Sequence, residues 1–329
     1  MLYISKSTRK RPPNTKEIWG QVVMELVEQC SMKVATACHL FGHCRQAFYQ
    51  SKADIEAEVN RDKVILDNVR EIRDEDPGIG GYKLWLMLTE LYGRKLILGR
   101  DSFFTLLRRH QLMLPPRKAA RHTTNSNHRY HKWKNLVKGI VLTSANQLWV
   151  SDITYIQLAN GDVAYLHLVT DAYSRKIVGW VLADTLRAAL SIQALQMAID
   201  QAIEMKGGES LKGLIHHSDR GVQYCCDAYV QKLQEYDISI SMTEDYKPTD
   251  NAIAERVNGI IKMEKVYRMH VFKDIECARA TIGRYIQFYN NRRPHMSIGY
   301  KTPAKAHLEQ GIQQKMWKKR IYTSKKKDS

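Results

Sequence analysis

The feature that most constrains this chain is the order of its apolar segments between residues 145 and 268. Three partly alternating segments follow one another at hairpin spacing, and an amphipathic helical segment comes next. The chain then alternates between short apolar runs and helical segments. We expect strands at 148–158, 163–172, 175–183, 213–217 and 238–242, and helices at 185–205, 227–237 and 249–268. This order predicts an α/β domain with one mixed five-stranded sheet.

Three acidic residues fall where these elements can bring them together. Asp152 lies inside the first predicted strand, and Asp219 lies just beyond the fourth. Glu255 follows Asp219 with 35 residues between them (residues 220 to 254) and lies on the last predicted helix. One face of that helix carries Asn251, Glu255, Asn258 and Lys262, at i, i+4, i+7 and i+11. If this face crosses the sheet edge, the three carboxylates meet, as in a ribonuclease-H-like catalytic core.

Three neighbouring carboxylates repel one another unless cations lie among them. Mg²⁺ and Mn²⁺ prefer such hard oxygen ligands and take substrate phosphate as a further ligand. Two such ions could support in-line attack on a phosphodiester. A single aspartate at a strand end is more often a turn former, so the argument depends on all three acids together.

The charge distribution favours a nucleic-acid partner. The net charge is +17, and it divides into +11 for residues 1–140, −6 for 141–260 and +12 for 261–329. Residues 102–151 contain no Asp or Glu but nine Lys and Arg, which predicts an extended basic linker along a phosphate backbone. A solvated spacer is the alternative. The lysine-rich stretch 315–327 is expected to be a solvated tail that binds phosphate without sequence preference.

The residues before this linker read as two helical DNA-binding domains. VATACHLFGHCRQAFYQ (34–50) has the pattern of a helix-turn-helix with its turn at Gly42, although an ordinary helical hairpin would look similar. We expect a flexible basic lead at 1–16, helical DNA-binding domains at 17–53 and 54–114, the linker at 115–142, the catalytic core at 143–270, and a C-terminal helical segment and basic tail at 271–329. The expected DNA contacts in the front part are Arg45, Arg117, Lys118, Arg121, Arg129, Lys132 and Lys134.

The cysteines and the apolar segments bear on metal content and location. The six cysteines form no CxxC pair and no disulfide framework, which indicates a reduced, cytoplasmic protein. Cys38, His39, His43 and Cys44 suggest a zinc finger. No later CxxC pair supplies the other half of such a site, so we expect no zinc. Neither a signal peptide nor a membrane-spanning segment is evident in the sequence, so we expect no membrane association.

Taken together, these motifs resemble the DDE transposases of bacterial insertion sequences, in particular the second-reading-frame (OrfB-like) type, within the retroviral integrase superfamily. The matching stretches are WVSDITYI, LVTDAYSRKIVGW, HHSDRGVQY, TDNAIAERVNGIIKMEK and FYNNRRPHMSIGYKTPA, with VATACHLFGHCRQAFYQ and GIGGYKLWLML upstream. The resemblance covers about residues 17–308.

The resemblance implies roles for particular residues. Asp152, Asp219 and Glu255 would be the catalytic ligands of two Mg²⁺ ions, for which Mn²⁺ could substitute. Lys262 would contact DNA near the active site. We expect further DNA contacts from Asn251, Asn258, Arg292 and Arg293, and support for the metal ligands from His217, Gln223 and Tyr224. We interpret Asp171, in VTDAYSR, as structural, because a side chain one strand over need not reach the metals.

The implied function is binding of terminal inverted repeats, Mg²⁺-dependent strand cleavage, and transfer of the 3′-hydroxyl to target DNA. Family members bridge two DNA ends as dimers or larger complexes, and often as a fusion with a small first-frame protein. A bacterial, nucleoid-associated enzyme is therefore expected. Two alternatives stay open: an inactive DNA-binding regulator derived from a transposase, and a ribonuclease of the same fold.

Overall fold

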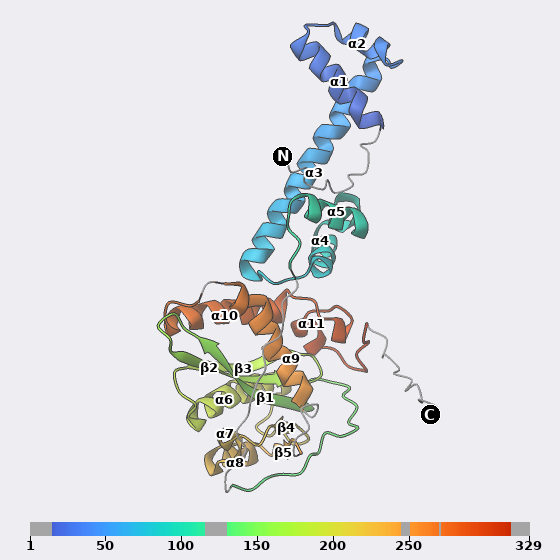
Figure 1. Ribbon diagram of the computed structural model, residues 1–329. Coiled ribbons are helices and arrows are strands. Elements are labelled where there is room, and N and C mark those ends of the chain that lie inside the picture. Colours follow the sequence, from blue (N-terminus) through green and yellow to red (C-terminus); the bar gives the residue numbers. More distant parts are fainter. Residues whose placement is uncertain (1–14, 116–129, 245–250, 270, 317–329) are drawn as a thin grey trace, which may run out of the picture. The chain divides into compact units, whose positions relative to one another are not determined.

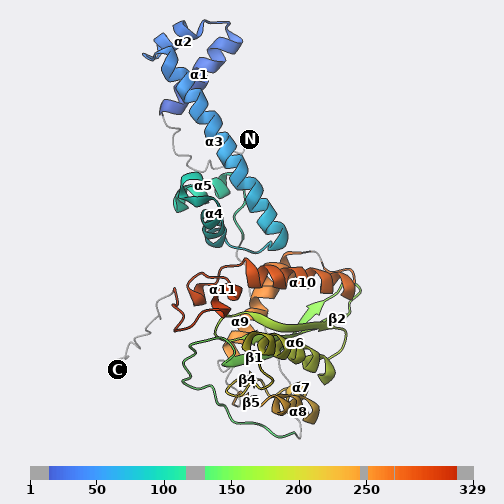
Figure 2. The same cartoon turned by 180° about the vertical axis from the view of Figure 1, so that it is seen from behind.

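The computed structural model describes residues 15–115, 130–244, 251–269 and 271–316 (Figures 1 and 2). The chain divides into two compact units, Met1–Arg70 and Glu71–Ser329. Within the described ranges, no helix has both the length and the apolar composition that a membrane crossing requires.

The first unit is a helical domain with an aromatic core. Helix α1 (Thr15–Gln29) precedes α2 (Val34–Leu40), and α3 (Arg45–Glu75) begins after a turn in which Gly42 has a φ of 70°. Glycine adopts this conformation without strain. The buried core consists of Trp19, Val23, Ala37, Cys38 and Phe48. The succession of α2, turn and α3 agrees with the predicted helix-turn-helix, and Arg45 is exposed at the start of α3.

Helix α3 differs from the prediction in its length. It runs through position 53/54, so no break in secondary structure marks the domain boundary predicted there. The compact units instead divide at Arg70/Glu71. Helices α4 (Gly81–Leu96) and α5 (Arg100–Arg109) follow, and α4 is kinked at Gly93. Both belong to the same compact unit as the sheet.

The second unit contains the predicted mixed five-stranded sheet. Its strands are β1 (Leu148–Gln157), β2 (Val163–Asp171), β3 (Ile177–Ala183), β4 (Ile215–Ser218) and β5 (Ser239–Met242). Their order is β3-β2-β1-β4-β5. β1, β2 and β3 are antiparallel neighbours, whereas β4 pairs parallel to β1 and to β5. The α/β ribonuclease-H-like prediction is confirmed at this level.

Helices cover both faces of this sheet. On one face lie α6 (Ala188–Lys206), α7 (Val222–Cys225) and α8 (Asp227–Glu235), which pack around Trp149 of β1. Gly179 of β3 lets α6 approach closely, because a Cβ there would lie 1.9 Å from the carbonyl oxygen of Ala194. On the other face, α9 (Ala252–Ile260) packs against Leu148 and Val150. Side chains alternate along a strand, so Asp152 shares the face of Val150.

The C-terminal segment joins the α9 face of the sheet. Helix α10 (Ile275–Asn291) lies on the opposite side of the sheet from α6 in both views (Figures 1 and 2). The Asn290 side chain exchanges hydrogen bonds of 2.9 Å with the backbone N–H and C=O of Ile177. A 3₁₀ turn (Met296–Ile298) and α11 (Pro303–His307) complete the described chain. The predicted C-terminal segment is therefore packed on the core sheet.

The described part of the basic linker lies along β5, at the edge of the sheet. The Leu136 N–H donates to Ser241 Oγ at 2.9 Å, and Lys138 Nζ lies 2.6 Å from Glu244 Oε2. This segment contains no helix and covers a strand edge that would otherwise be open to pairing with another chain. Lys132 and Lys134 remain exposed on it. The predicted contacts Arg117, Lys118, Arg121 and Arg129 lie outside the described residues.

Candidate active site

The two aspartates are adjacent because of the parallel pairing of β1 with β4. Ser151 and Ser218 are partners in this ladder, and each is followed directly by one of the acids. Asp152 and Asp219 therefore lie at the same level of neighbouring strands, where β4 ends. Gly221 N donates to Asp219 Oδ1 at 3.0 Å, and the Ile153 N–H donates to Asp152 Oδ1 at 2.9 Å.

Helix α9 crosses this point of the sheet and is held there by two buried amides. Asn258 Nδ2 donates to Asp152 Oδ2 at 2.7 Å, and Asn251 Nδ2 donates to the Ser151 carbonyl at 3.0 Å. Glu255 lies between these asparagines on the same face of the helix and is exposed. The face predicted from the spacing of residues on this helix is therefore the one that meets β1.

The electrostatics show that the charges of Asp219 and Glu255 act on Asp152. Burial raises the pKa of Asp152 to about 7; the Asp219 and Glu255 charges add to this rise, and hydrogen bonds from Ile153 and Asn258 oppose it. Burial raises the pKa of Glu255. Burial lowers the pKa of Lys262, and the charge of Asp152 opposes that shift. A cation placed among these oxygens would relieve the repulsion.

The donor set fits Mg²⁺, although the oxygens are not gathered into a ready-made cage. Among the described residues, no three His, Cys, Asp or Glu side chains lie close enough together to hold a metal ion. Asp152 has both oxygens engaged by protein N–H groups. Carboxylate oxygens alone are the ligands that Mg²⁺ and Mn²⁺ prefer. Binding would require Glu255, which is exposed, to turn toward the aspartates.

The histidines beside Asp219 are buried and bonded within the protein. His216 Nε2 lies 2.8 Å from Ser151 Oγ and 2.9 Å from Tyr229 Oη. Burial lowers the pKa of His216 to about 3, so this ring is neutral. His217 Nδ1 lies 2.8 Å from Ser241 Oγ and thereby ties β4 to β5. Neither ring is available to DNA in this structure.

Tyr224 and Gln223, which are also predicted to support the metal ligands, differ in their position. Tyr224 is buried, and its pKa is raised by burial, by Tyr229 and by the charges of Asp152 and Asp219. It is therefore close to the carboxylates, as support for the metal ligands requires. Gln223 instead donates to the Leu186 carbonyl at 3.2 Å, which ties the turn after β4 to the chain before α6.

Three of the predicted DNA contacts are buried and bonded within the protein in this structure. Asn251 and Asn258 are 5% and 6% exposed, and both are bonded to β1. Arg293 is 2% exposed and ion-paired to Glu264 at 2.6 Å. Arg292, its neighbour, is exposed and pairs with Glu75. The hydrogen bond from Asn258 to Asp152 is not among the predictions from the sequence. The signal for it is an amide side chain one helical turn after Glu255, on the face expected to meet the sheet.

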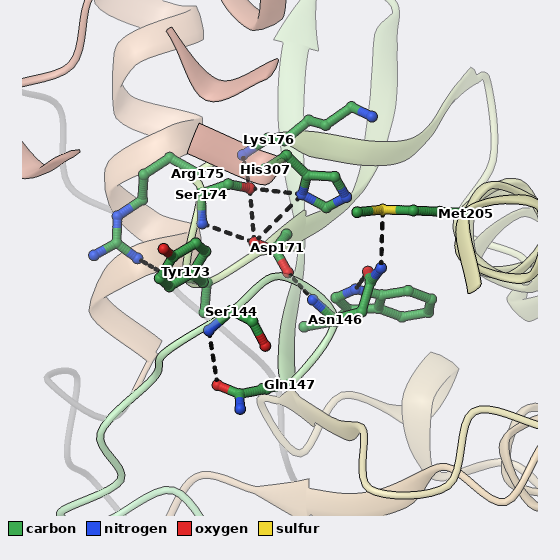
Figure 3. A network of polar contacts seen from close by, with 12 residues as sticks. Ser144, Asn146, Gln147, Asp171, Tyr173, Ser174, Arg175, Lys176, Met205 and His307 are labelled. Carbon is green, nitrogen blue, oxygen red and sulfur yellow. Dashed lines mark hydrogen bonds and ion pairs between the residues drawn. The ribbon is translucent and has the colours of Figure 1, made fainter. Parts of the chain in front are cut away.

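Asp171 is buried, and its carboxylate accepts hydrogen bonds from neighbouring segments of the protein (Figure 3). Its carboxylate accepts from the backbone N–H of Asn146 at 2.8 Å, and from the backbone N–H and hydroxyl of Ser174, each at 2.7 Å. Ser174 Oγ also lies 2.9 Å from His307 Nδ1 of α11. Asp171 is 0% exposed. It therefore joins the start of β1, the β2–β3 turn and α11, which supports the structural interpretation.

The raised pKa of Asp152 predicts a measurable effect on stability. Between the unfolded value near 4 and the folded value of about 7, the native state binds more protons, so the free energy of unfolding falls as pH rises. Without divalent metal at pH 8, Asp152→Asn should therefore stabilise the protein by about 1–3 kcal/mol. The gain should shrink toward pH 4. Urea unfolding at both pH values measures it.

Added Mg²⁺ provides the control for this experiment. It should stabilise the wild type and leave Asp152→Asn nearly unchanged. Equal stability of the two proteins at pH 8 would mean that the charged Asp152 carboxylate does not destabilise the folded protein.

Comparisons with known proteins agree with this architecture. The chain matches the family described as "Integrase core domain" over residues 143–248 and again over 236–303. It is 31% identical over 245 residues to the protein of insertion sequence element IS986/IS6110 of Mycobacterium tuberculosis (strain ATCC 25618 / H37Rv), covering 74% of this chain and 86% of that relative. It is 28% identical over 265 residues to the transposase for insertion sequence element IS629 of Shigella sonnei, covering 80% and 85%.

A solved structure covers about half of this chain. The HTLV-2 integrase catalytic core domain in complex with magnesium shares 21% identity at a TM-score of 0.38, covering 50% of this chain and 97% of that one. The family assignment depends on the sequence relatives, which align over most of their own length. The chain belongs to the insertion-sequence transposases with an integrase core domain, within the retroviral integrase superfamily.

Proposed function

We propose that this transposase binds the terminal inverted repeats of its own insertion sequence, cleaves one DNA strand there, and joins the exposed 3′-hydroxyl to another phosphodiester. The observation that carries the proposal is the pairing of Ser151 with Ser218, which makes Asp152 and Asp219 neighbours under the helix of Glu255. Neighbouring carboxylates repel one another unless a cation lies between them, so a purely structural role for this pair is disfavoured.

The proposed roles follow from the contacts of each side chain. Asp152, Asp219 and Glu255 would hold Mg²⁺, with Mn²⁺ as a substitute. A bound pair of such ions would supply an activated water or 3′-hydroxyl and stabilise the leaving oxygen. Asn258 orients the Asp152 carboxylate through its 2.7 Å hydrogen bond. Lys262, beside Asp152, is placed to neutralise a DNA phosphate. The proposal requires no covalent protein–DNA intermediate.

DNA binding is assigned to those predicted contacts that are exposed in the structure. Among the described residues these are Arg45, Lys132, Lys134 and Arg292, together with the partly exposed Lys262. We expect a homodimer or larger assembly that bridges two DNA ends on the bacterial nucleoid, alone or with a first-frame protein. Two element ends must be held at once for their joining to be coordinated.

The exposed linker lysines give a prediction about salt dependence. Replacing Lys132 and Lys134 together by alanine should weaken end binding, and the slope of log K against log salt should fall by about 0.9 for each DNA phosphate that the variant no longer neutralises. Titrations of labelled ends at several salt concentrations measure this slope.

Lys212→Ala is the matched control. Lys212 is an exposed lysine that precedes β4, so it lies at the opposite end of that strand from Asp219. An unchanged slope in the double variant would show that this part of the linker does not track the backbone.

The direct test of the proposed function uses duplex DNA carrying the ends that flank this reading frame. With Mg²⁺, the wild type should nick one strand at the element boundary and leave a 3′-hydroxyl. With EDTA, it should bind without nicking. Metal-dependent cleavage of an RNA–DNA hybrid in place of these ends would instead support a ribonuclease.

A further inference from the structure

The helix that carries Glu255 continues beyond α9 in an altered form. The backbone passes directly into a π-helical turn, η2 (Ile261–Lys265), and a 3₁₀ turn, η3 (Val266–Arg268). π-Helical turns are rare and occur frequently at functional sites. The sequence predicted an ordinary helix here. The altered turn presents two consecutive residues, Glu264 and Lys265, to the connection between α3 and α4.

That connection touches the η2 backbone itself. A Cβ added at Gly78 would lie 2.2 Å from Glu264 Cα and 2.6 Å from the Glu264 carbonyl oxygen, so only glycine fits at this position. Lys265 is 5% exposed, and its Nζ donates to the carbonyl oxygens of Asp74 at 3.1 Å and Glu75 at 2.8 Å. Lys265 thus satisfies carbonyls at the C-terminal end of α3, which otherwise lack intrahelical partners.

The same contact contains a buried group of charges. Glu264 accepts from Arg293 Nε and Nη2, each at 2.6 Å, and its Oε1 lies 3.1 Å from Lys83 Nζ of α4. Burial would raise the pKa of Glu264, but Arg293 and Lys83 bring it down to about 2, so the carboxylate is ionised. Asp76, from the same connection, lies 3.8 Å from Arg293 Nε. One anion of the Glu255 helix therefore joins α4 to the segment after α10.

We propose that Gly78, Lys83 and Glu264 are positioning residues, which set the place of Glu255 by clamping the far end of its helix onto the α3–α4 connection. Asn251 and Asn258 hold α9 against β1. The contacts of Gly78, Lys83 and Glu264 form the clamp, which holds η2, the continuation of α9. A helix is stiff along its axis, so a shift at η2 displaces Glu255. The role in catalysis rests on the proposed function; the mechanical role does not.

Lys83 offers the mildest way to open the clamp, because it is only partly buried and Arg293 stays with Glu264. The test compares Lys83→Met with Lys83→Arg and with Lys305→Met. Lys305 also pairs with α4, through Glu90 at 2.6 Å, but it belongs to α11 and its partner is not on the Glu255 helix. Lys305→Met therefore removes an α4 ion pair without touching the clamp.

The first readout is hydrogen–deuterium exchange of the free protein. Lys83→Met should speed exchange several-fold in residues 252–265 and leave β1 and β2 unchanged. Lys83→Arg and Lys305→Met should match the wild type, and Gly78→Ala should reproduce Lys83→Met. The second readout is cleavage of element ends against Mg²⁺ concentration. Lys83→Met should raise the half-saturating concentration by about 10-fold without weakening end binding.

Unchanged exchange in residues 252–265 of both Lys83→Met and Gly78→Ala would overturn the positioning role, as would an equal change in Lys305→Met. If the wild type cleaves no ends, the proposed function fails, and the exchange data still decide whether the clamp positions the helix. If exchange changes while the half-saturating Mg²⁺ concentration does not, the contact is a structural tie and the proposed role is wrong.

Discussion

Asp152→Asn, Asp219→Asn and Glu255→Gln should each slow strand cleavage at the element ends by about 10³-fold or more, which corresponds to about 4 kcal/mol of transition-state stabilisation. An amide keeps the size of the carboxyl group but loses the negative charge that attracts a divalent ion. Asp152 and Asp219 follow paired residues of β1 and β4, so neither can replace the other without moving a strand. End binding should stay within a few-fold of wild type, because these substitutions leave every assigned DNA contact, Lys262 included, in place.

Cleavage and binding must be measured on the same DNA to separate these effects. Single-turnover rates with Mg²⁺ give the first quantity, and gel-shift titrations with EDTA give the second. Asp162→Asn, in the exposed β1–β2 turn, is the matched control and should leave both unchanged. Wild-type cleavage by any of the three active-site variants would remove that residue from the set. A folded Asp171→Asn protein that is inactive would show that the set was chosen wrongly.

Arg293→Ala should destabilise the second unit by about 3–5 kcal/mol, because it leaves a buried charge without its partner. Arg293 is 2% exposed and donates two hydrogen bonds to Glu264. Its Nη1 also lies 2.9 Å from His295, whose pKa is lowered well below its usual range by burial and by the Arg293 charge. Removing the guanidinium therefore eliminates three buried hydrogen bonds at once. Guanidinium chloride unfolding measures the destabilisation.

The adjacent arginine supplies the control for this variant. Arg292 is exposed, and its ion pair with Glu75 is of the kind that contributes about 0–1 kcal/mol. Arg292→Ala should therefore shift the unfolding midpoint little. If Arg293→Ala were as stable as wild type and instead bound DNA more weakly, Arg293 would be a DNA contact, as the sequence alone indicates.

The sheet and its acids could be predicted because their signals are local. The apolar runs around Trp149 and Val169 alternate in part with polar residues, and the turn at 159–162 marks a hairpin. The order of the strands comes from the structure, because the succession of elements favours β1, β2 and β3 as neighbours but does not place β4 beside β1. An acid within the first strand and another just after the fourth become neighbours once those strands pair in parallel. The period of a helix indicated the face that Glu255 shares with Asn251 and Asn258, whereas Glu255 itself is exposed in the structure.

The surroundings of Arg293 and Asn258 depend on tertiary burial, which the sequence does not reveal. Arg293 stands in a basic, aromatic stretch typical of a DNA surface, and only the fold shows that Glu264 faces it. Asn258 has a helical position that suits a DNA contact or a bond to Asp152 equally well, and the depth of α9 on β1 decides between them. The π-helical turn at 261–265 has no sequence signal, and Gly78, which packs against Glu264 of this turn, lies far from it in the sequence.

The measurement that tests the central claim most directly is strand transfer. Duplexes ending in the 3′-hydroxyl of each element terminus would be mixed with a supercoiled target plasmid, Mg²⁺, and either wild type or Asp219→Asn. The account predicts covalently joined products, with the terminus linked to the target strand, for the wild type alone. Tight binding of the ends without joined products, in Mg²⁺ and in Mn²⁺ and with the first-frame protein added, would contradict it and indicate a DNA-binding regulator.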